Sequence, residues 1–99
     1  MSKPIYMLVM AKGYTEAGYQ LSEEQRDALW AKVMEADKRA GGKNIIACNS
    51  RWADEEYYDW AVIEYPDMDA YQKKVEELEK LEWWRYAVTK TILGTKMED

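Results

Sequence analysis

Residues 44–65, NIIACNSRWADEEYYDWAVIEY, decide the fold, because two runs of strand-forming residues flank a short acidic segment there. The first run, residues 44–51, is apolar on both faces before it turns polar. The second run, residues 57–65, is dense in aromatic and β-branched residues, which favour strands. Residues 52–56 connect them. The stretch therefore predicts two neighbouring strands joined by an acidic hairpin loop.

Two further strands are predicted near the ends of the chain. Residues 4–12 (PIYMLVMAK) place apolar side chains on both faces, which is typical of a strand that is covered on both sides. Residues 87–93 (AVTKTIL) form the last strand, with Lys90 at its centre. A lysine there is either a guard against edge pairing or, if buried, a base or Schiff-base nucleophile.

Two helices are predicted between these strands. Ser22 and Gln25 form a capping box, and the glycine pair at 41–42 ends the first helix. Asp67, directly after Pro66, caps the second helix. Each helix carries one apolar stripe at helical spacing, and these stripes are expected to face the sheet.

Two connections contain aromatic residues. Residues 13–21 (GYTEAGYQL) are predicted to be a loop, whose tyrosines either lie on the sheet or close over a pocket. Residues 81–86 (LEWWRY) are predicted to be a bend that brings two tryptophans into the fold.

The predicted order is β-α-β-β-α-β within one domain, residues 1–99. This order is that of the ferredoxin-like α+β fold, a four-stranded antiparallel sheet with two helices on one face. Two helices can cover only one face, yet the strands are apolar on both. We therefore expect a homodimer that forms through the uncovered face of the sheet.

Composition narrows the possible partners. The net charge is −5 and no basic block occurs, so the electrostatic footprint of a nucleic-acid-binding protein is missing. A single cysteine, Cys48, excludes an internal disulfide and is expected to be an inert buried thiol. The apolar run at 5–11 is too short to span a bilayer and lacks the features of a signal peptide. We expect a cytoplasmic protein with no membrane partner.

The absence of two residue types narrows the chemistry. There is no His, the commonest general base and metal ligand, and no metal-binding motif, so we expect no metal or other cofactor. There is also no Phe, so all aromatic residues are Tyr or Trp, each with a polar group. Such a composition suits either a half-polar cavity or an interface, and simple core packing is the alternative.

The element order, the two-faced strand at 5–10 and the Trp-rich bend resemble the dimeric α+β-barrel superfamily. More closely, the stretches CNSRWADEEYYDW and WWRYAVTKTILGT resemble a small uncharacterised family within it. The resemblance implies two sheets packed face to face and a pocket between the sheet and helices of one subunit. The superfamily includes antibiotic-biosynthesis monooxygenases, polyketide cyclases and haem-degrading enzymes. Haem-degrading members and several cyclases use a His, so their functional residues do not carry over.

Glu64 and Tyr86 are the candidate catalytic residues. Glu64 stands in an apolar strand, and if it is buried there it could act as a general base. Because it is near the strand end, it could instead reach solvent or pair with Lys90 or Arg85. Tyr86, paired with Arg85 or Lys90, could perform acid–base chemistry in place of His.

Six residues are candidate ligand contacts. Arg51 could hold a carboxylate or phosphate, or form a salt bridge with Asp54 or Glu55. The aromatic candidates could line an apolar cavity or pack in the core. The full set is Tyr6, Arg51, Tyr58, Trp60, Trp84 and Arg85.

The sequence thus predicts a homodimeric barrel that binds a small aromatic or hydrophobic molecule. Cofactor-independent cyclisation or oxygenation of that molecule is one possibility. A non-catalytic binding or accessory protein, and a purely structural module, are the alternatives. A cavity of at least ~300 Å³ that contains Glu64 or Arg51 would favour binding or catalysis over a structural role.

Overall fold

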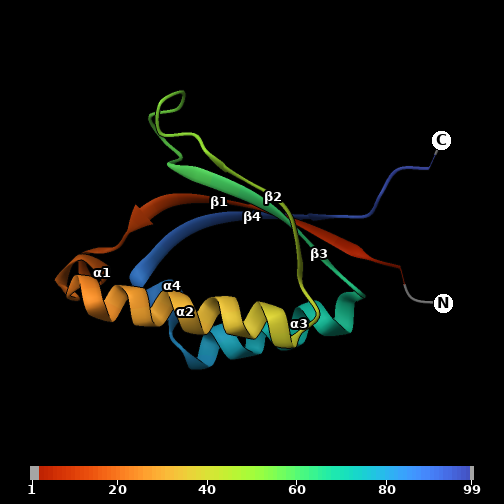
Figure 1. Cartoon of the computed structure of the whole chain (residues 1–99), viewed down its shortest axis with the longest axis horizontal. Coiled ribbons are helices and arrows are strands. Elements are labelled where there is room, and N and C mark those ends of the chain that lie inside the picture. Colours follow the sequence, from red (N-terminus) through yellow and green to blue (C-terminus); the bar gives the residue numbers. More distant parts are fainter. Residues whose placement is uncertain (1–2, 99) are drawn as a thin grey trace.

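Four antiparallel strands in the order β2-β3-β1-β4 form one sheet in the computed structural model, which describes residues 3–98. The helices lie on one face of this sheet (Figure 1). The predicted α+β ferredoxin-like arrangement is confirmed. The strands are β1 (Ile5–Tyr14), β2 (Lys43–Asn49), β3 (Asp59–Tyr65) and β4 (Ala87–Gly94).

Two long helices, α2 (Glu23–Arg39) and α3 (Met68–Lys80), form the layer beneath the sheet. Both begin at the predicted caps. The Ser22 side chain accepts a hydrogen bond from the Gln25 backbone, and the Gln25 side chain accepts one from the Ser22 backbone. The Asp67 carboxylate accepts a bond from the backbone N–H of Ala70 at 2.8 Å. No helix among residues 3–98 is long and apolar enough to cross a membrane.

Two predicted connections contain short helices. α1 (Glu16–Gln20) lies within residues 13–21, and α4 (Trp83–Tyr86) lies within residues 81–86. Tertiary contacts stabilise them: the Thr15 N–H donates to the carbonyl of Tyr86 at 3.0 Å. Gly18 allows this close approach, because a Cβ there would lie 2.2 Å from the Tyr86 carbonyl oxygen. A local pattern could not predict these turns, since each depends on the other.

The helix-facing side of the sheet forms the core. Met7 of β1 and Tyr65 of β3 are almost fully buried there. From the helices, Val33, Ala36 and Leu78 are also buried, as the predicted apolar stripes require. The core is therefore confined to the space between one face of the sheet and the two long helices.

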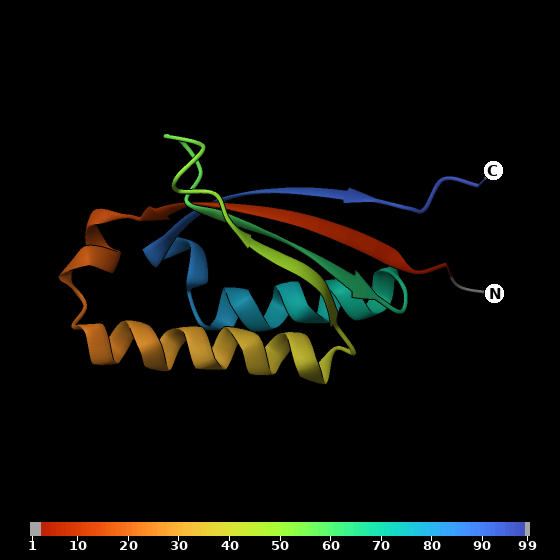
Figure 2. The same ribbon diagram turned by 45° about the horizontal axis from the view of Figure 1, so that its top comes forward.

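No helix or strand of residues 3–98 covers the other face of the sheet, and we call it the open face (Figures 1 and 2). Cross-strand register places mostly apolar residues on it. The edge-strand side chains Ile46 and Ile92 are 48% and 49% exposed. Cys48, which was expected to be buried, is only half-buried because β2 is an edge strand. The open face consists of Lys43, Ile46 and Cys48 of β2, Trp60, Val62 and Glu64 of β3, Tyr6, Leu8 and Met10 of β1, and Lys90 and Ile92 of β4.

Candidate functional site

The predicted site residues lie in two separate regions. Tyr6, Trp60 and Glu64 lie on the open face, whereas Arg51, Tyr58 and the residues of α4 lie at the end of the molecule near α1. Glu64 pairs across the sheet with Tyr6, which faces Gly94 at the far end of β4. Tyr86 directly precedes β4, so the eight residues of that strand separate the two, a span of roughly 25 Å. The two predicted catalytic residues therefore do not meet within one chain.

On the open face, Tyr6 and Glu64 form a direct hydrogen bond. The Tyr6 hydroxyl donates to Glu64 Oε1 at 2.6 Å. This bond to the carboxylate raises the pKa of the Tyr6 phenol above its ordinary value. No ion pair joins Glu64 to Lys90 or Arg85 within residues 3–98. Register explains this, since Lys90 stands opposite Met10 rather than opposite Tyr6. The pair can accept a proton at the carboxylate and donate one from the phenol.

At the hairpin loop, Arg51 stacks on an aromatic ring. Its guanidinium lies 4.3 Å from the centre of the Tyr58 ring. Asp54, one of its expected ion-pair partners, instead accepts backbone hydrogen bonds from Glu56 and Tyr57. Those bonds, led by the Tyr57 N–H, hold the pKa of Asp54 below its ordinary value. The loop is thus bonded internally, through backbone hydrogen bonds and a stacked ring instead of the expected salt bridge.

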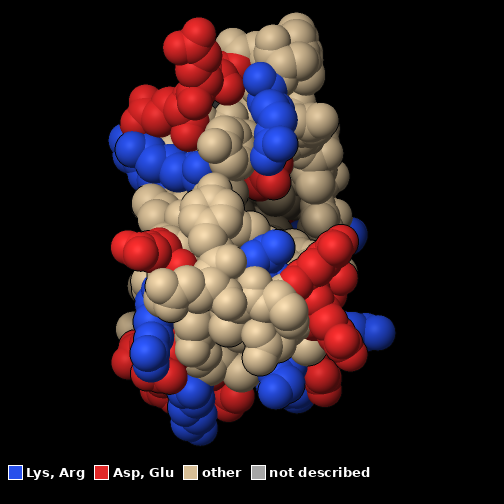
Figure 3. Space-filling model, turned by 90° about the vertical axis from the view of Figure 1, so that its left-hand side faces the viewer, with Lys and Arg blue, Asp and Glu red and all other residues tan. Residues whose placement is uncertain are grey.

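Tyrosines gather where the hairpin loop approaches α1. Gly13 has a φ of +127°, and a Cβ there would lie 3.1 Å from the Tyr58 ring and 3.5 Å from the Tyr19 hydroxyl. Tyr14 contacts Tyr19 edge to face at 5.7 Å between ring centres. Figure 3 shows this end of the molecule, where uncharged residues form a broad patch between acidic and basic side chains. Position 13 therefore favours glycine for two reasons, the positive φ of its backbone and the close approach of the Tyr58 ring.

The residues of α4 lie at the same end. Thr15 bonds to the carbonyls of Arg85 and Tyr86, so α4 is attached to α1. The Arg85 guanidinium lies 5.6 Å from the Tyr86 ring centre and 3.6 Å from Glu82. Trp84 is exposed. Arg85 therefore contacts both the Tyr86 ring and the Glu82 carboxylate.

A buried polar cluster of Asp37, Tyr65, Tyr71 and Lys74 lies on the opposite face of the sheet, and sequence reasoning missed it. The side chain of Lys74 is only 6% exposed, with its Nζ 3.6 Å from Asp37 and 3.4 Å from the Met7 sulfur. The Tyr65 hydroxyl donates to the same Asp37 carboxylate. The rings of Tyr65 and Tyr71 lie 5.6 and 5.5 Å from the lysine Nζ.

Burial dominates the electrostatics of this buried polar cluster. It lowers the pKa of Lys74 and raises that of Tyr65, because the charged form of each is disfavoured away from water. The charge of Asp37 partly opposes the effect on Lys74. A signal was present in the sequence: Lys74 stands four residues before Leu78, and Asp37 four after Val33, so both fall on the apolar stripes.

Asp59 is a second acid that the sequence did not single out. It stands opposite Ala11 and Asn49, on the side of the sheet that faces the helices. Partial burial raises the pKa of its carboxyl group, and the charge of Arg51 opposes this effect. The Asp59 residue as a whole remains exposed to solvent.

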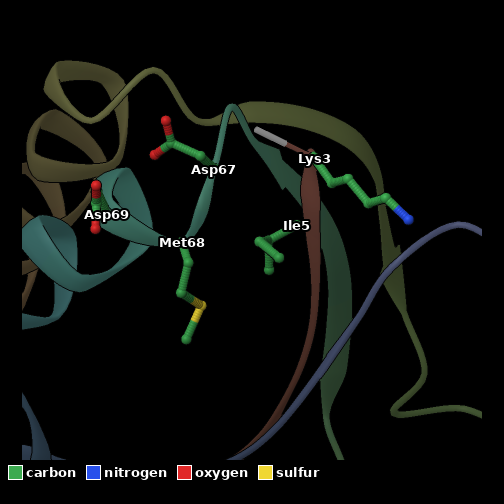
Figure 4. Close-up of a pocket in the computed structure, with 5 residues that line it drawn as sticks. All are labelled: Lys3, Ile5, Asp67, Met68 and Asp69. Carbon is green, nitrogen blue, oxygen red and sulfur yellow. The ribbon is translucent and has the colours of Figure 1, made fainter. Parts of the chain in front are cut away.

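Two open hollows occur near the start of β1. One, of about 320 Å³, is lined by Lys3, Ile5, Asp67, Met68 and Asp69. Figure 4 shows Met68 and Ile5 directed toward its space, while Lys3 points away. The other, of about 420 Å³, is lined by Lys3, Pro4, Tyr6, Thr95, Lys96, Met97 and Glu98. Neither is lined by Glu64 or Arg51, but the second contains Tyr6, the hydrogen-bond partner of Glu64.

No group of three or more His, Cys, Asp or Glu side chains among residues 3–98 is arranged to hold a metal ion. The polar groups on the open face are instead the phenol of Tyr6, the carboxylate of Glu64, the indole of Trp60, the thiol of Cys48 and the ammonium groups of Lys43 and Lys90.

Comparison with known proteins supports the fold. No family model and no curated protein matches the chain. One similar solved structure is RPA0582 of Rhodopseudomonas palustris, a protein of unknown function. It is 16% identical to this chain with a TM-score of 0.68, and the match covers 100% of this chain and 86% of RPA0582. Another is a point mutant of SnoaB from Streptomyces nogalater, a cofactor-independent oxygenase. It is 12% identical with a TM-score of 0.56, and the match covers 99% of this chain and 97% of SnoaB. These likenesses show the fold of the chain, which both solved structures share at low sequence identity.

Proposed function

We propose that this protein is a homodimer that binds a small aromatic or hydrophobic molecule beside the Tyr6–Glu64 pair, with cofactor-independent cyclisation or oxygenation as the reaction class. The observation that carries the proposal is this hydrogen-bonded pair on an otherwise largely apolar, uncovered sheet face. Apolar surroundings with few polar groups are the usual composition of a small-molecule site.

The exposed area supports self-association. The chain exposes 7275 Å², whereas a compact monomer of 11.7 kDa exposes roughly 5,900 Å². The excess of roughly 1,400 Å² exceeds the roughly 800 Å² that each partner of a standard interface buries. A second copy packed on the open face would remove its exposed apolar side chains, such as Ile46 and Ile92, from water, which is favourable.

Dimerisation would also change the chemistry of the Tyr6–Glu64 pair. In one chain both side chains are half-buried, and water reaches them. Between two sheets water would be excluded, and a carboxylate in apolar surroundings becomes a stronger base. Proton removal from a phenol, or from a carbon beside a carbonyl, begins both cyclisation and cofactor-independent oxygenation. Glu64 is the proposed base and Tyr6 the proposed proton donor.

The hollow that contains Tyr6 is the proposed entrance. Its volume of about 420 Å³ suits a molecule of one or two rings, and its rim carries Lys3 and Lys96. Two ammonium groups would attract an acidic phenol or carboxylate. SnoaB acts as an oxygenase without a cofactor on the same fold, which supports this reaction class. A binding or accessory protein with the same pocket is the alternative.

The test is a screen of phenols with one or two rings by tryptophan fluorescence and oxygen consumption. We expect saturable binding by the wild type, and a loss of turnover of roughly a hundredfold or more in Glu64→Gln with binding retained. Binding without turnover by any ligand would favour the accessory alternative. An absence of binding, with light scattering that gives a monomer mass at micromolar concentration, would overturn the proposal.

A further inference from the structure

The hairpin loop, residues 50–58, rises from the sheet on the side away from the helices. Figures 1 and 2 both show it, in green, on that side of the sheet. It is the segment that projects furthest beyond the open face in both views. A second copy seated on the open face would therefore meet this loop as well as the flat sheet.

The loop is held in one conformation by bonds that it makes to itself and to β1. The backbone N–H groups of Ala53 and Asp54 donate to the carbonyl of Ser50 at 2.9 and 2.8 Å. Glu56 forms an ion pair with Lys12 of β1 at 2.8 Å. A loop fixed in this way loses little conformational entropy when it contacts a partner.

This loop presents a large aromatic side chain to water. Trp52 is 85% exposed, while its indole N–H donates to the Asn49 carbonyl at 3.0 Å. The indole is thus oriented but uncovered. Tryptophan is among the residues most enriched at the energetic centres of protein interfaces, because it buries a large area at a small entropic cost.

Charge is consistent with a second copy as the occupant. The loop contains Asp54, Glu55 and Glu56 against a single Arg51. The edge strands of the sheet carry lysines, Lys43 opposite Glu64 and Lys90 opposite Met10. An acidic loop that reaches over a partner sheet with lysines at its edges meets charge of the opposite sign.

We propose that the hairpin loop contacts the second copy of this chain and that Trp52 packs against the partner subunit. The interface then has two parts, the flat apolar sheet face and the indole on the loop. This inference rests on the proposed homodimer and adds to it a specific anchor outside the sheet.

The test is the dimer dissociation constant, measured by sedimentation over a dilution series from micromolar to nanomolar concentration. We expect Trp52→Ala to raise the dissociation constant by about tenfold or more. Met34→Ala is the matched control, because Met34 is an exposed apolar residue on α2, in the helix layer. That variant should change the constant by less than about threefold. Circular dichroism would verify that both variants fold.

A second measurement makes the role of the indole visible. The difference in emission between wild type and Trp52→Phe isolates the Trp52 signal, which should shift to longer wavelength when the dimer is diluted apart. An unshifted Trp52 signal, or an unchanged dissociation constant in Trp52→Ala, would overturn the inference while the sheet dimer stands. Leu8→Asp, on the open face, should abolish the dimer. A wild type that is monomeric throughout the series would overturn both the proposed dimer and this inference.

Discussion

The same sheet carries two tyrosine–carboxylate hydrogen bonds, one on each face. Glu64 and Tyr65 are neighbours in β3, and alternation points Glu64 to the open face and Tyr65 to the core. Glu64 accepts from Tyr6, while Tyr65 donates to Asp37. The chemistry of the bond is alike, but the surroundings differ. In the core, the Lys74 Nζ lies 3.6 Å from Asp37. On the open face, Lys43 stands opposite Glu64 in the strand register, but no ion pair joins Glu64 to a basic side chain within residues 3–98.

This difference separates a structural pair from a candidate functional one. A buried carboxylate is stable only when its charge is compensated, and Lys74 compensates that of Asp37. The cluster ties α2, α3 and β3 together and leaves no exposed reactive group. The open-face pair has no ion-pair partner within residues 3–98, although Lys43 stands opposite Glu64, and it remains accessible to a ligand or a second copy. Four predictions test the contrast.

The largest effect is expected from Asp37→Ala. This change leaves the ammonium of Lys74 and the hydroxyl of Tyr65 without their shared carboxylate in a buried site. We expect a loss of about 3–5 kcal/mol in the free energy of unfolding by urea. Glu35→Ala is the control on the same helix, because Glu35 forms a solvent-exposed ion pair with Arg39, with 2.9 Å between Oε1 and the guanidinium nitrogen. Its loss should stay below about 1 kcal/mol. Equal losses in the two variants would refute a stabilising role for the cluster.

Matched phenylalanine substitutions compare the two hydrogen bonds directly. Tyr65→Phe removes a buried bond to a carboxylate and should cost about 1.5–3 kcal/mol of unfolding free energy. Tyr6→Phe removes a bond that water can replace, so it should cost clearly less, at a protein concentration where the chain is monomeric. If Tyr6→Phe proves the costlier of the two in the monomer, the assigned contrast between the faces is wrong.

A smaller net effect is expected from the double variant Asp37→Asn, Lys74→Met. It removes both charges together, and replacement of a buried ion pair by groups of similar size is often neutral. We expect unfolding free energy within about 1 kcal/mol of the wild type, well above that of Asp37→Ala. A double variant as unstable as Asp37→Ala would show that shape, rather than charge compensation, governs this site.

The smallest effect is a pH dependence between neutral pH and pH 10. Burial lowers the pKa of Lys74 in the folded chain below its ordinary 10.5, so folded Lys74 releases its proton while the unfolded chain still binds it. Stability therefore increases with pH as the folded pKa is passed. Tyr65 does not affect this range, because its pKa is raised in the folded chain and its titration lowers stability only above the ordinary tyrosine pKa of 10.0. We expect the unfolding free energy, measured with denaturant, to increase toward pH 10 in the wild type but not in Lys74→Met. The same increase in Lys74→Met would show that Lys74 is not its source.

The sequence by itself determined the features that depend on near neighbours along the chain. The capping box at Ser22, the cap at Asp67 and the alternation in β3 are local, so the element order and the two faces of the sheet followed from them. The fold class was predictable for this reason. The position of Glu64 and Trp60 on one face was predictable on the same ground.

Only the tertiary structure decided which side chains meet. The Tyr6–Glu64 bond depends on the register of β1 against β3, and α1 depends on its contact with Tyr86. Lys74 stands on the apolar stripe of α3, but its partners Asp37 and Tyr65 come from two other elements. These contacts join residues that are far apart along the chain. Local propensity acts over a few residues, whereas register and burial depend on the whole chain, so the partners could not be assigned before the fold was known.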